Sequence, residues 1–173
     1  AECQEREAKH ALYYDDTDEE IKPQRVVEIV GEITDSKAYV VTDVGQHQMW
    51  VSQFYPFSFP RQMITSGGLG TMGYGIPAGI GVKFVHPESQ VVVFVGDGGF
   101  QMTNQEFAIL NEHNLDIKFV LMNNHVLGMV HQWQEKFHGA RFSSSEFKTQ
   151  PDFMKLAEAY HVKGVRLSNP KTI

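Results

Sequence analysis

Residues 90–100 have the sequence QVVVFVGDGGF, and this short segment decides the fold class. Its unbroken apolar run, rich in β-branched valine, predicts a strand over 90–95. Directly after that strand, the acid Asp97 lies between glycines. Because open parallel sheets bind their ligands at the carboxyl ends of the strands, Asp97 is the first candidate site residue.

Strand and helix patterns alternate on both sides of this segment. Apolar residues spaced as on one helix face, with Pro23 near the first turn, predict a helix over 23–36, and a buried strand follows over 38–43. The alternation indicates an α/β fold, namely a doubly wound parallel sheet with helices on both faces. The remaining predicted helices cover 47–55, 76–84, 104–114, 127–137 and 151–161, and the remaining strands cover 61–65, 117–122 and 162–167.

Composition limits the classes of protein to which the chain can belong. Its 173 residues, 42% hydrophobic and 21% charged, suit one globular domain, which we place at 23–173 after a polar lead-in over 1–22. The net charge is −6 and Lys and Arg do not cluster, so no nucleic-acid partner is expected. No apolar run reaches the roughly 18 residues of a membrane span, so no membrane partner is expected either.

Two features of the chain bear on where it belongs. Cys3 is the single cysteine, so an intrachain disulfide is excluded and a reducing, cytoplasmic location is expected. The sequence begins without Met and stops just after a candidate strand. We therefore expect it to be a piece of a longer polypeptide.

The glycine-rich residues 65–75, TSGGLGTMGYG, contain a G-x-G-x-x-G spacing that begins at Gly68. In dinucleotide-binding folds this spacing turns a strand tightly into a helix beneath a pyrophosphate. Glu88 follows near the spacing of an acid that holds a ribose. A lone fingerprint is weak evidence, because Gly also gathers where backbones pack closely, so a nicotinamide or flavin site is an open alternative at this point.

A second strand end matches the one before Asp97. The strand predicted over 117–122 is followed by Asn124, one strand-helix-strand unit later, so the two side chains can converge at neighbouring strand ends. A carboxylate and an amide oxygen are hard donors suited to Mg²⁺, and Gly98 and Gly99 let backbone N–H groups approach a diphosphate. Each feature alone is typical of a turn, but together they favour a magnesium-diphosphate site.

The residues after Asp97 refine this interpretation. Thr103 and Glu106 predict a capping box that opens the helix over 104–114, whose N-terminal dipole favours anions. An EF-hand is excluded, because the loop lacks the alternating acids that such a loop requires.

The G-D-G at 96–98, followed by paired asparagines after the next strand, resembles the motif of thiamine-diphosphate-dependent enzymes. The resemblance runs from about residue 23 onward and is closest to the C-terminal, diphosphate-binding domain of the large catalytic subunit of acetohydroxyacid synthase (acetolactate synthase). It implies the thiamine-diphosphate-binding fold, without the N-terminal pyrimidine-binding and central domains, and it makes the G-x-G-x-x-G spacing coincidental. Three segments carry the narrower resemblance: GQHQMW at 45–50, TSGGLGTMGYGIPAGIG at 65–81 and GMVHQWQEKF at 128–137.

The resemblance implies a role for each candidate site residue. The metal ligands would be the side chains of Asp97 and Asn124 and the backbone carbonyl of Val126. Met72 would be the apolar wedge that bends the cofactor, and the Gly70 carbonyl would accept a hydrogen bond from the aminopyrimidine. The other residues implied around the cofactor are Gln46, His47, Thr71, Gly96, Gly98, Gly99, Leu127, Gly128 and Met129.

Two residues of the helix over 127–137 are implied at the substrate. Met129 and Trp133 are one helical turn apart and share a face. Without the resemblance they would be ordinary core residues. With it, they join Gly70 and Met72 at the catalytic centre, and Trp133 would shape the pocket for the acceptor 2-ketoacid.

The resemblance also implies an activity. The parent enzyme would decarboxylate pyruvate with thiamine diphosphate and Mg²⁺ and join the two-carbon unit to a second 2-ketoacid, pyruvate or 2-ketobutyrate, in branched-chain amino acid biosynthesis. A homodimer or tetramer of the full-length chain and a regulatory small subunit are the implied partners, and FAD would be bound mainly by the central domain. The chain alone is expected to be inactive, because the glutamate that activates thiamine lies in the pyrimidine-binding domain.

Two alternatives to this activity are open at this point. The first is a domain of another thiamine-diphosphate enzyme, such as a 2-ketoacid decarboxylase or oxidase, which would share the metal motif without the three narrower segments. The second is a non-catalytic binding module, which would bind no cofactor.

Overall fold

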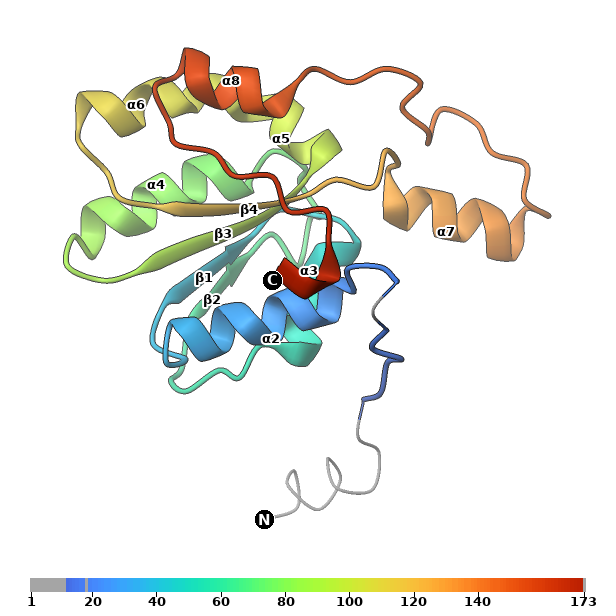
Figure 1. Ribbon diagram of the computed structural model, residues 1–173, viewed down its shortest axis with the longest axis horizontal. Coiled ribbons are helices and arrows are strands. Elements are labelled where there is room, and N and C mark those ends of the chain that lie inside the picture. Colours follow the sequence, from blue (N-terminus) through green and yellow to red (C-terminus); the bar gives the residue numbers. More distant parts are fainter. Residues whose placement is uncertain (1–11, 18, 173) are drawn as a thin grey trace.

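The computed structural model describes residues 12–17 and 19–172, so much of the predicted lead-in over 1–22, including Cys3, lies outside the described residues. The centre of this part of the chain is a parallel sheet of four strands in the order β2-β1-β3-β4 (Figure 1). The strands are β1 (Tyr39–Thr42), β2 (Met63–Thr65), β3 (Val91–Gly96) and β4 (Lys118–Met122).

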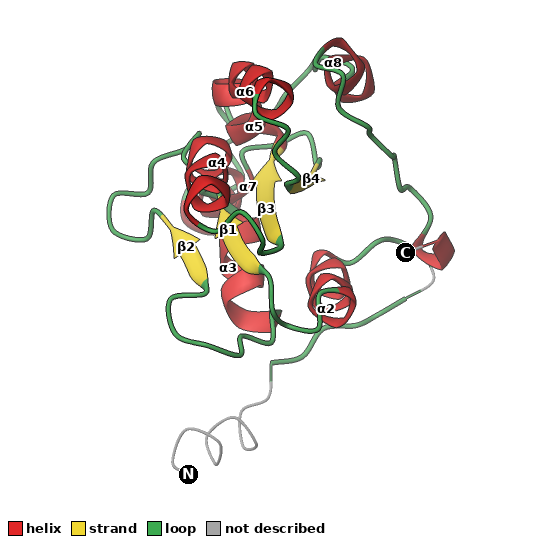
Figure 2. Ribbon diagram, turned by 90° about the vertical axis from the view of Figure 1, so that its left-hand side faces the viewer, coloured by secondary structure: helices red, strands yellow, loops and turns green. Residues whose placement is uncertain are grey.

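Helices cover both faces of this sheet, as Figures 1 and 2 show from two directions. The face below the sheet in Figure 1 carries α2 (Pro23–Ile33) and α3 (Gln46–Phe54). The opposite face carries α4 (Gly75–Val85), α5 (Asp97–Thr103), α6 (Phe107–Glu112) and α8 (Phe153–Ala159). The predicted doubly wound α/β fold is therefore confirmed.

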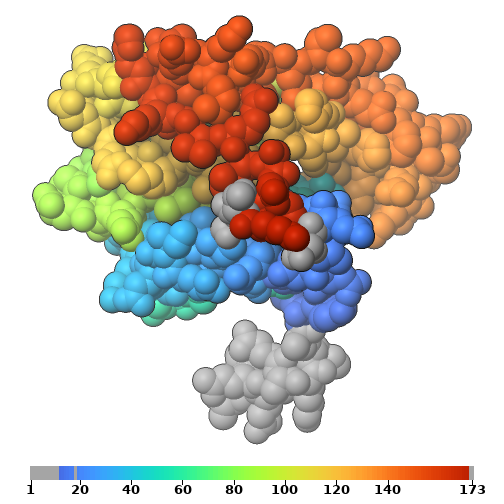
Figure 3. All heavy atoms as spheres, viewed as in Figure 1, coloured from blue at the N-terminus to red at the C-terminus, as the bar shows by residue number. Residues whose placement is uncertain are grey.

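One helix belongs to neither layer. α7 (Gly128–Phe137) lies beyond the carboxyl ends of β3 and β4, and with the residues that follow it forms one end of the molecule (Figures 1 and 3). Its position places it beside the edge of the sheet where a ligand is expected.

The strand β3 is the centre of the core because it lies between two strands and two helix layers. Val91, Val93 and Val95 point into the apolar cluster beneath α4, α5 and α6, and the alternate residues Val92 and Phe94 point into the cluster beneath α2 and α3. All five are buried, and each contributes about 1.5–3 kcal/mol relative to an exposed position. This explains why the run is apolar throughout.

The register of the sheet aligns the residues that follow the strands. Thr42 of β1 pairs with Phe94 of β3, and Gly96 of β3 pairs with Met122 of β4. Asp97 follows Gly96 directly, and Asn124 is the second residue after Met122. Both side chains therefore leave neighbouring strand ends at one edge, as the sequence predicts.

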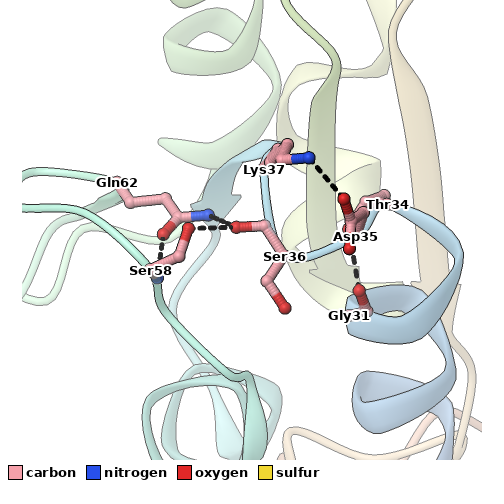
Figure 4. A network of polar contacts seen from close by, with 7 residues as sticks. All are labelled: Gly31, Thr34, Asp35, Ser36, Lys37, Ser58 and Gln62. Atoms are coloured by element: carbon pink, nitrogen blue, oxygen red, sulfur yellow. Dashed lines mark hydrogen bonds and ion pairs between the residues drawn. The ribbon is translucent and has the colours of Figure 1, made fainter.

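At the opposite, amino end of the sheet, the buried Gln62 side chain holds two connections together (Figure 4). Its Nε2 donates to the carbonyl oxygens of Ser36, at 2.7 Å, and Ala38, at 2.8 Å. Its Oε1 accepts from the backbone N–H groups of Ser58, at 2.8 Å, and Phe59, at 3.3 Å. Every hydrogen-bonding position of the amide is thus used.

The predicted capping box at Thr103 and Glu106 is wrong. The helix after β3 starts at Asp97 itself, and a 3₁₀ turn over Asn104–Glu106 joins it to α6. The Thr103 hydroxyl donates to the Gly73 carbonyl at 3.0 Å and makes no capping hydrogen bond. The pattern was local, whereas the hydroxyl finds its partner in a loop distant in sequence.

One further predicted helix is shorter than expected, and one predicted strand is absent. The helix predicted over 23–36 ends at Ile33, because Asp35 and Ser36 adopt left-handed conformations with φ of 50° and 55°. The strand predicted over 162–167 is wrong, since these residues form no strand. Val165 and Leu167 are 82% and 53% exposed, so apolar alternation there lacks the packing that makes a strand.

Candidate functional site

A cavity of about 220 Å³ opens at the carboxyl edge of the sheet. It is formed by the residues that follow β1, β3 and β4, by the glycine-rich loop before α4 and by the start of α7. The predicted site residues that line it are Gln46, His47, Gly70, Met72, Gly96, Asp97, Gly98, Gly99, Asn124, Val126, Leu127, Gly128 and Met129. Sequence reasoning assigned no role to five further lining residues: Val44, Gly45, Trp50, Met122 and Val130.

Asp97 is the buried acid of this cavity and the first residue of α5. Its Oδ1 accepts from the Gly98 N–H at 2.8 Å, and its Oδ2 accepts from the His125 N–H, also at 2.8 Å. The Gln150 Nε2 donates to the same Oδ2 at 2.6 Å. Three donors therefore fix the orientation of the carboxylate. Gln150 was missed, and no local pattern signals it, because it lies on a segment remote from Asp97 in sequence.

The other two predicted metal ligands lie in the loop after β4. The Asn124 Oδ1 accepts from the Val126 N–H at 3.2 Å, and both residues line the cavity with Asp97. In the described part of the chain, no three His, Cys, Asp or Glu side chains gather as a metal site. A cation here would therefore combine one carboxylate with amide and backbone oxygens, a donor set that suits Mg²⁺.

Glycines form the floor of the cavity at positions where a side chain would not fit. A Cβ at Gly98 would lie 2.6 Å from the Leu127 Cδ2, and a Cβ at Gly128 would lie 2.2 Å from the Gln46 Oε1. Glycine at these positions lets the Leu127 and Gln46 side chains pack directly against the backbone that lines the cavity.

His47 contributes a buried ring whose Nε2 has no hydrogen-bond partner among the described residues. Burial lowers the pKa of this imidazole, opposed by the negative charges of Asp43 and Asp97 and by a hydrogen bond to the Asp43 backbone. An unpaired buried polar atom costs about 1–3 kcal/mol. His47 therefore offers a free nitrogen to a ligand in the cavity.

Asp43, which sequence reasoning missed, organises the glycine-rich loop. Its Oδ1 accepts from the N–H groups of Val44, at 2.8 Å, and Gly73, at 3.0 Å, and its Oδ2 accepts from the Gly75 N–H at 2.7 Å. The signal was available, because Asp43 follows a buried strand as Asp97 does.

This carboxylate answers the question raised by the G-x-G-x-x-G spacing. Helix α4 begins at Gly75, beyond the last glycine of the fingerprint, and Asp43 already accepts from the N–H groups that a pyrophosphate would use. Glu88 precedes β3 and is exposed at the amino end of the strands, opposite the cavity. The dinucleotide alternative is therefore wrong.

The glycine-rich loop contributes Gly70 and Met72 to the cavity. Gly70 has a φ of +62°, a conformation that favours glycine. The Met72 Cε would lie 3.3 Å from a Cβ at Gly98, so its thioether lies over the glycine floor. Thr71 is exposed and does not line the cavity, which separates it from the other predicted cofactor residues.

Helix α7 lines this cavity and also a more open depression of about 660 Å³. Met129 lines both spaces, whereas Trp133 lines only the depression. Trp133 is 62% exposed and makes an edge contact with Phe137, with ring centroids 5.7 Å apart. Its interpretation as an ordinary core residue is therefore wrong.

Comparison with known proteins agrees with the geometry of this edge. The chain is 57% identical to the acetolactate synthase large subunit of Lactococcus lactis subsp. lactis over 95% of its length, 46% identical to that of Haemophilus influenzae over 98%, and 48% identical to the acetolactate synthase isozyme 3 large subunit of Escherichia coli over 94%. It spans 29%, 30% and 28% of these three relatives. No helix in the described ranges is long and apolar enough to cross a membrane.

The family match covers the site. Residues 43–173 match the family described as "Thiamine pyrophosphate enzyme, C-terminal TPP binding domain", a span that contains every predicted site residue from Gln46 to Trp133. The structure brings Asp97 and Asn124 to one edge of the sheet, as in the motif on which the resemblance rested. The chain therefore belongs to the family of C-terminal thiamine-pyrophosphate-binding domains of thiamine pyrophosphate enzymes.

Proposed function

We propose that this chain binds the diphosphate of thiamine diphosphate through Mg²⁺ in the carboxyl-edge cavity, as the cofactor domain of an acetolactate synthase large subunit. One observation carries the proposal: Asp97, Asn124 and Val126 converge on one glycine-floored cavity at neighbouring strand ends. The relatives are named acetolactate synthase large subunits, which supports the choice of this enzyme.

The residues present fit both parts of the cofactor. The cavity offers an anion the backbone of its lining glycines and the unpaired His47 Nε2, which would donate once the charge of the anion raises the imidazole pKa and the ring is protonated. The apolar Met72 and Met129 suit the rings of the cofactor rather than its phosphates. The cavity thus has a polar and an apolar part, as an amphipathic cofactor requires.

Each group of residues has a separate task in this proposal. Asp97, Asn124 and the Val126 carbonyl hold Mg²⁺, and Gln46 and His47 hold the diphosphate with the backbone of the glycine floor. Met72 and the Gly70 carbonyl fix the position of the rings. Bound thiamine diphosphate supplies the electron sink that lets a 2-ketoacid lose its carboxyl group.

The remaining features of the enzyme belong to the whole protein. We propose that its substrates are pyruvate and a second 2-ketoacid in branched-chain amino acid biosynthesis, that it acts in the cytoplasm, and that Trp133 faces the acceptor. A homodimer or tetramer, a regulatory small subunit and a central domain that binds FAD complete the proposal. The relatives are named as large subunits, which supports an assembly of more than one chain type.

Calorimetric titration of the full-length protein with thiamine diphosphate, with and without Mg²⁺, tests the proposal. We expect heat of binding that depends on Mg²⁺, and a non-catalytic binding module would release none. The 173-residue chain, assayed alone with pyruvate and both cofactors, should form no acetolactate until a separately expressed N-terminal half is added. Acetolactate formed by the chain alone would contradict the proposed division of labour between domains.

A further inference from the structure

Residues 143–150, which we call the strap, run from the end of α7 back past the metal loop toward α8. The strap pairs with the loop after β4 through a short antiparallel bridge between Val126 and Glu146. The Leu127 N–H donates to the Ser145 carbonyl at 2.7 Å, and the Phe147 N–H donates to the His125 carbonyl at 2.8 Å. The two segments are therefore joined on both sides of Val126.

This pairing determines where the backbone of Val126 points. In an antiparallel bridge whose hydrogen bonds are made by the flanking residues, the N–H and carbonyl of the central residue face away from the partner strand. The Val126 N–H accordingly donates to the Asn124 Oδ1 at 3.2 Å. Within the described residues, no donor uses the Val126 carbonyl, and Val126 lines the cavity.

The strap also holds the carboxylate ligand. Gln150, at its end, donates from Nε2 to the Asp97 Oδ2 at 2.6 Å. The His125 N–H donates to the same oxygen, although His125 must adopt a left-handed φ of 62° to do so. His125 thus joins Asp97 through its N–H and the strap through its carbonyl.

The strap is itself anchored before it reaches these ligands. Ser145 is buried, and its Oγ donates to the Gln134 Oε1 of α7 at 2.6 Å. The Gln134 Nε2 donates in turn to the Ser143 carbonyl at 2.9 Å. Phe147 packs against the glycine floor, 3.2 Å from the position of a Cβ at Gly98. These contacts fix the strap at its beginning and middle, and Gln150 fixes its end.

We propose that the strap is a positioning element for the metal site, with Gln150 as the positioning residue for Asp97 and the Val126–Glu146 bridge as the element that turns the Val126 carbonyl toward the cation. This inference rests on the proposed function, since it concerns the Mg²⁺ of that site. Gln150 does not contact the cation in this scheme. It limits the movement of a ligand that does.

The choice of cation tests this positioning role. Mg²⁺ demands nearly ideal octahedral geometry, whereas Ca²⁺ accepts irregular geometry and longer bonds. A site whose ligands have been loosened should therefore lose Mg²⁺ more than Ca²⁺. Gln150→Met keeps the length of the side chain and removes the donor. Gln53→Met, at an exposed position of α3, is the matched control.

The measurement is calorimetric titration of each cation into the full-length protein in the presence of thiamine diphosphate. We expect Gln150→Met to raise the dissociation constant for Mg²⁺ by about tenfold, as substitutions behind metal ligands do, and to change that for Ca²⁺ by less than about threefold. The Gln53→Met control should match the unaltered protein for both cations. Gln150→Asn, which keeps a shortened amide, should be intermediate and serves if Gln150→Met does not fold.

The outcomes separate this inference from the proposed function. Unchanged Mg²⁺ affinity, tighter Mg²⁺ binding, or equal weakening of Mg²⁺ and Ca²⁺ in the Gln150 variants would overturn the positioning role of the strap. If the unaltered protein binds neither cation with thiamine diphosphate, the proposed function itself fails. Selective loss of Mg²⁺ affinity in Gln150→Met, with a smaller loss in Gln150→Asn and none in Gln53→Met, supports the inference.

Discussion

The two ends of the sheet differ in whether their buried polar atoms all have hydrogen-bond partners. At the amino end, Gln62 uses every hydrogen-bonding position of its amide on neighbouring backbone. At the carboxyl end, the His47 Nε2 and the Gln150 Oε1 are buried without a partner, among the described residues. Because unpaired buried groups destabilise a fold, the difference indicates that the amino end is built for stability and the carboxyl end for a ligand.

The largest expected effect is on binding, at the carboxyl end. Asp97→Asn removes the single charge among the three proposed ligands and should weaken Mg²⁺-dependent binding of thiamine diphosphate by on the order of 100-fold, the factor that corresponds to about 3 kcal/mol. Calorimetry on the full-length protein measures this, with Asp116→Asn at an exposed position as control. Normal cofactor affinity in Asp97→Asn would rule out the metal assignment.

The amino end should show the reverse behaviour. Gln62→Leu removes the side-chain partner of the Ala38 carbonyl and of the Ser58 and Phe59 N–H groups, and it leaves the Ser36 carbonyl with the Ser58 hydroxyl alone, so we expect the free energy of unfolding to fall by about 3 kcal/mol. Chemical denaturation measures the change, and Gln90→Leu at an exposed position should change stability little. Cofactor affinity of folded Gln62→Leu should stay unchanged. If it falls as much as in Asp97→Asn, the two ends do not have separate tasks.

His47 sharpens the comparison because its effect on binding should exceed its effect on stability. His47→Leu removes an unpaired buried nitrogen together with the hydrogen bond to the Asp43 backbone, so the free energy of unfolding at pH 7 should change by less than about 1 kcal/mol, while binding of thiamine diphosphate weakens. A variant that is both less stable and unimpaired in binding would contradict this assignment.

The pH dependence of stability provides a second measurement on His47. Burial lowers the pKa of its imidazole below the ordinary value of 6.5, so the unfolded chain binds more protons in that range. Stability of the unaltered protein should therefore decline as pH falls below about 6.5, and His47→Leu should lack this part of the decline. Denaturation curves at pH 7.5 to 5.5, taken as roughly the window around that pKa, test the sign.

The smallest expected effect on stability concerns Trp133. Because its side chain is largely exposed, Trp133→Leu should change the free energy of unfolding by less than about 0.5 kcal/mol. It should change the ratio of acetohydroxybutyrate to acetolactate formed by the full-length enzyme from mixed substrates. Phe84→Leu, at an exposed position of α4, is the control. A collapse of stability with an unchanged product ratio would return Trp133 to a structural role.

Much of this architecture could be predicted from sequence because its causes are local. A strand buried on both sides must be apolar throughout, and the parallel register then brings Asp97 and Asn124 to one edge. Asp43 could have been found by the same rule, since it also follows a buried strand. Acids that directly follow buried parallel strands therefore lie at the ligand-binding end of the sheet, whether they bind a ligand or order a loop.

The failures have a common physical origin in contacts between distant segments. Thr103 binds the Gly73 carbonyl instead of capping a helix, and Gln150 reaches Asp97 from the strap. Neither partner is visible in a local pattern, because both depend on how loops cross the sheet edge. Val165 shows the same limit, since apolar alternation cannot reveal that a segment finds no neighbouring strand.

The Asp43 carboxylate also affects the entropy change of cofactor association. By accepting from Val44, Gly73 and Gly75, it acts as a resident anion that keeps the glycine-rich loop in one conformation before any cofactor arrives. A loop that is already ordered loses little conformational freedom on binding, so more of the contact energy appears as affinity. The fold therefore uses a covalently attached acid to preorganise one wall of the pocket for a soluble diphosphate.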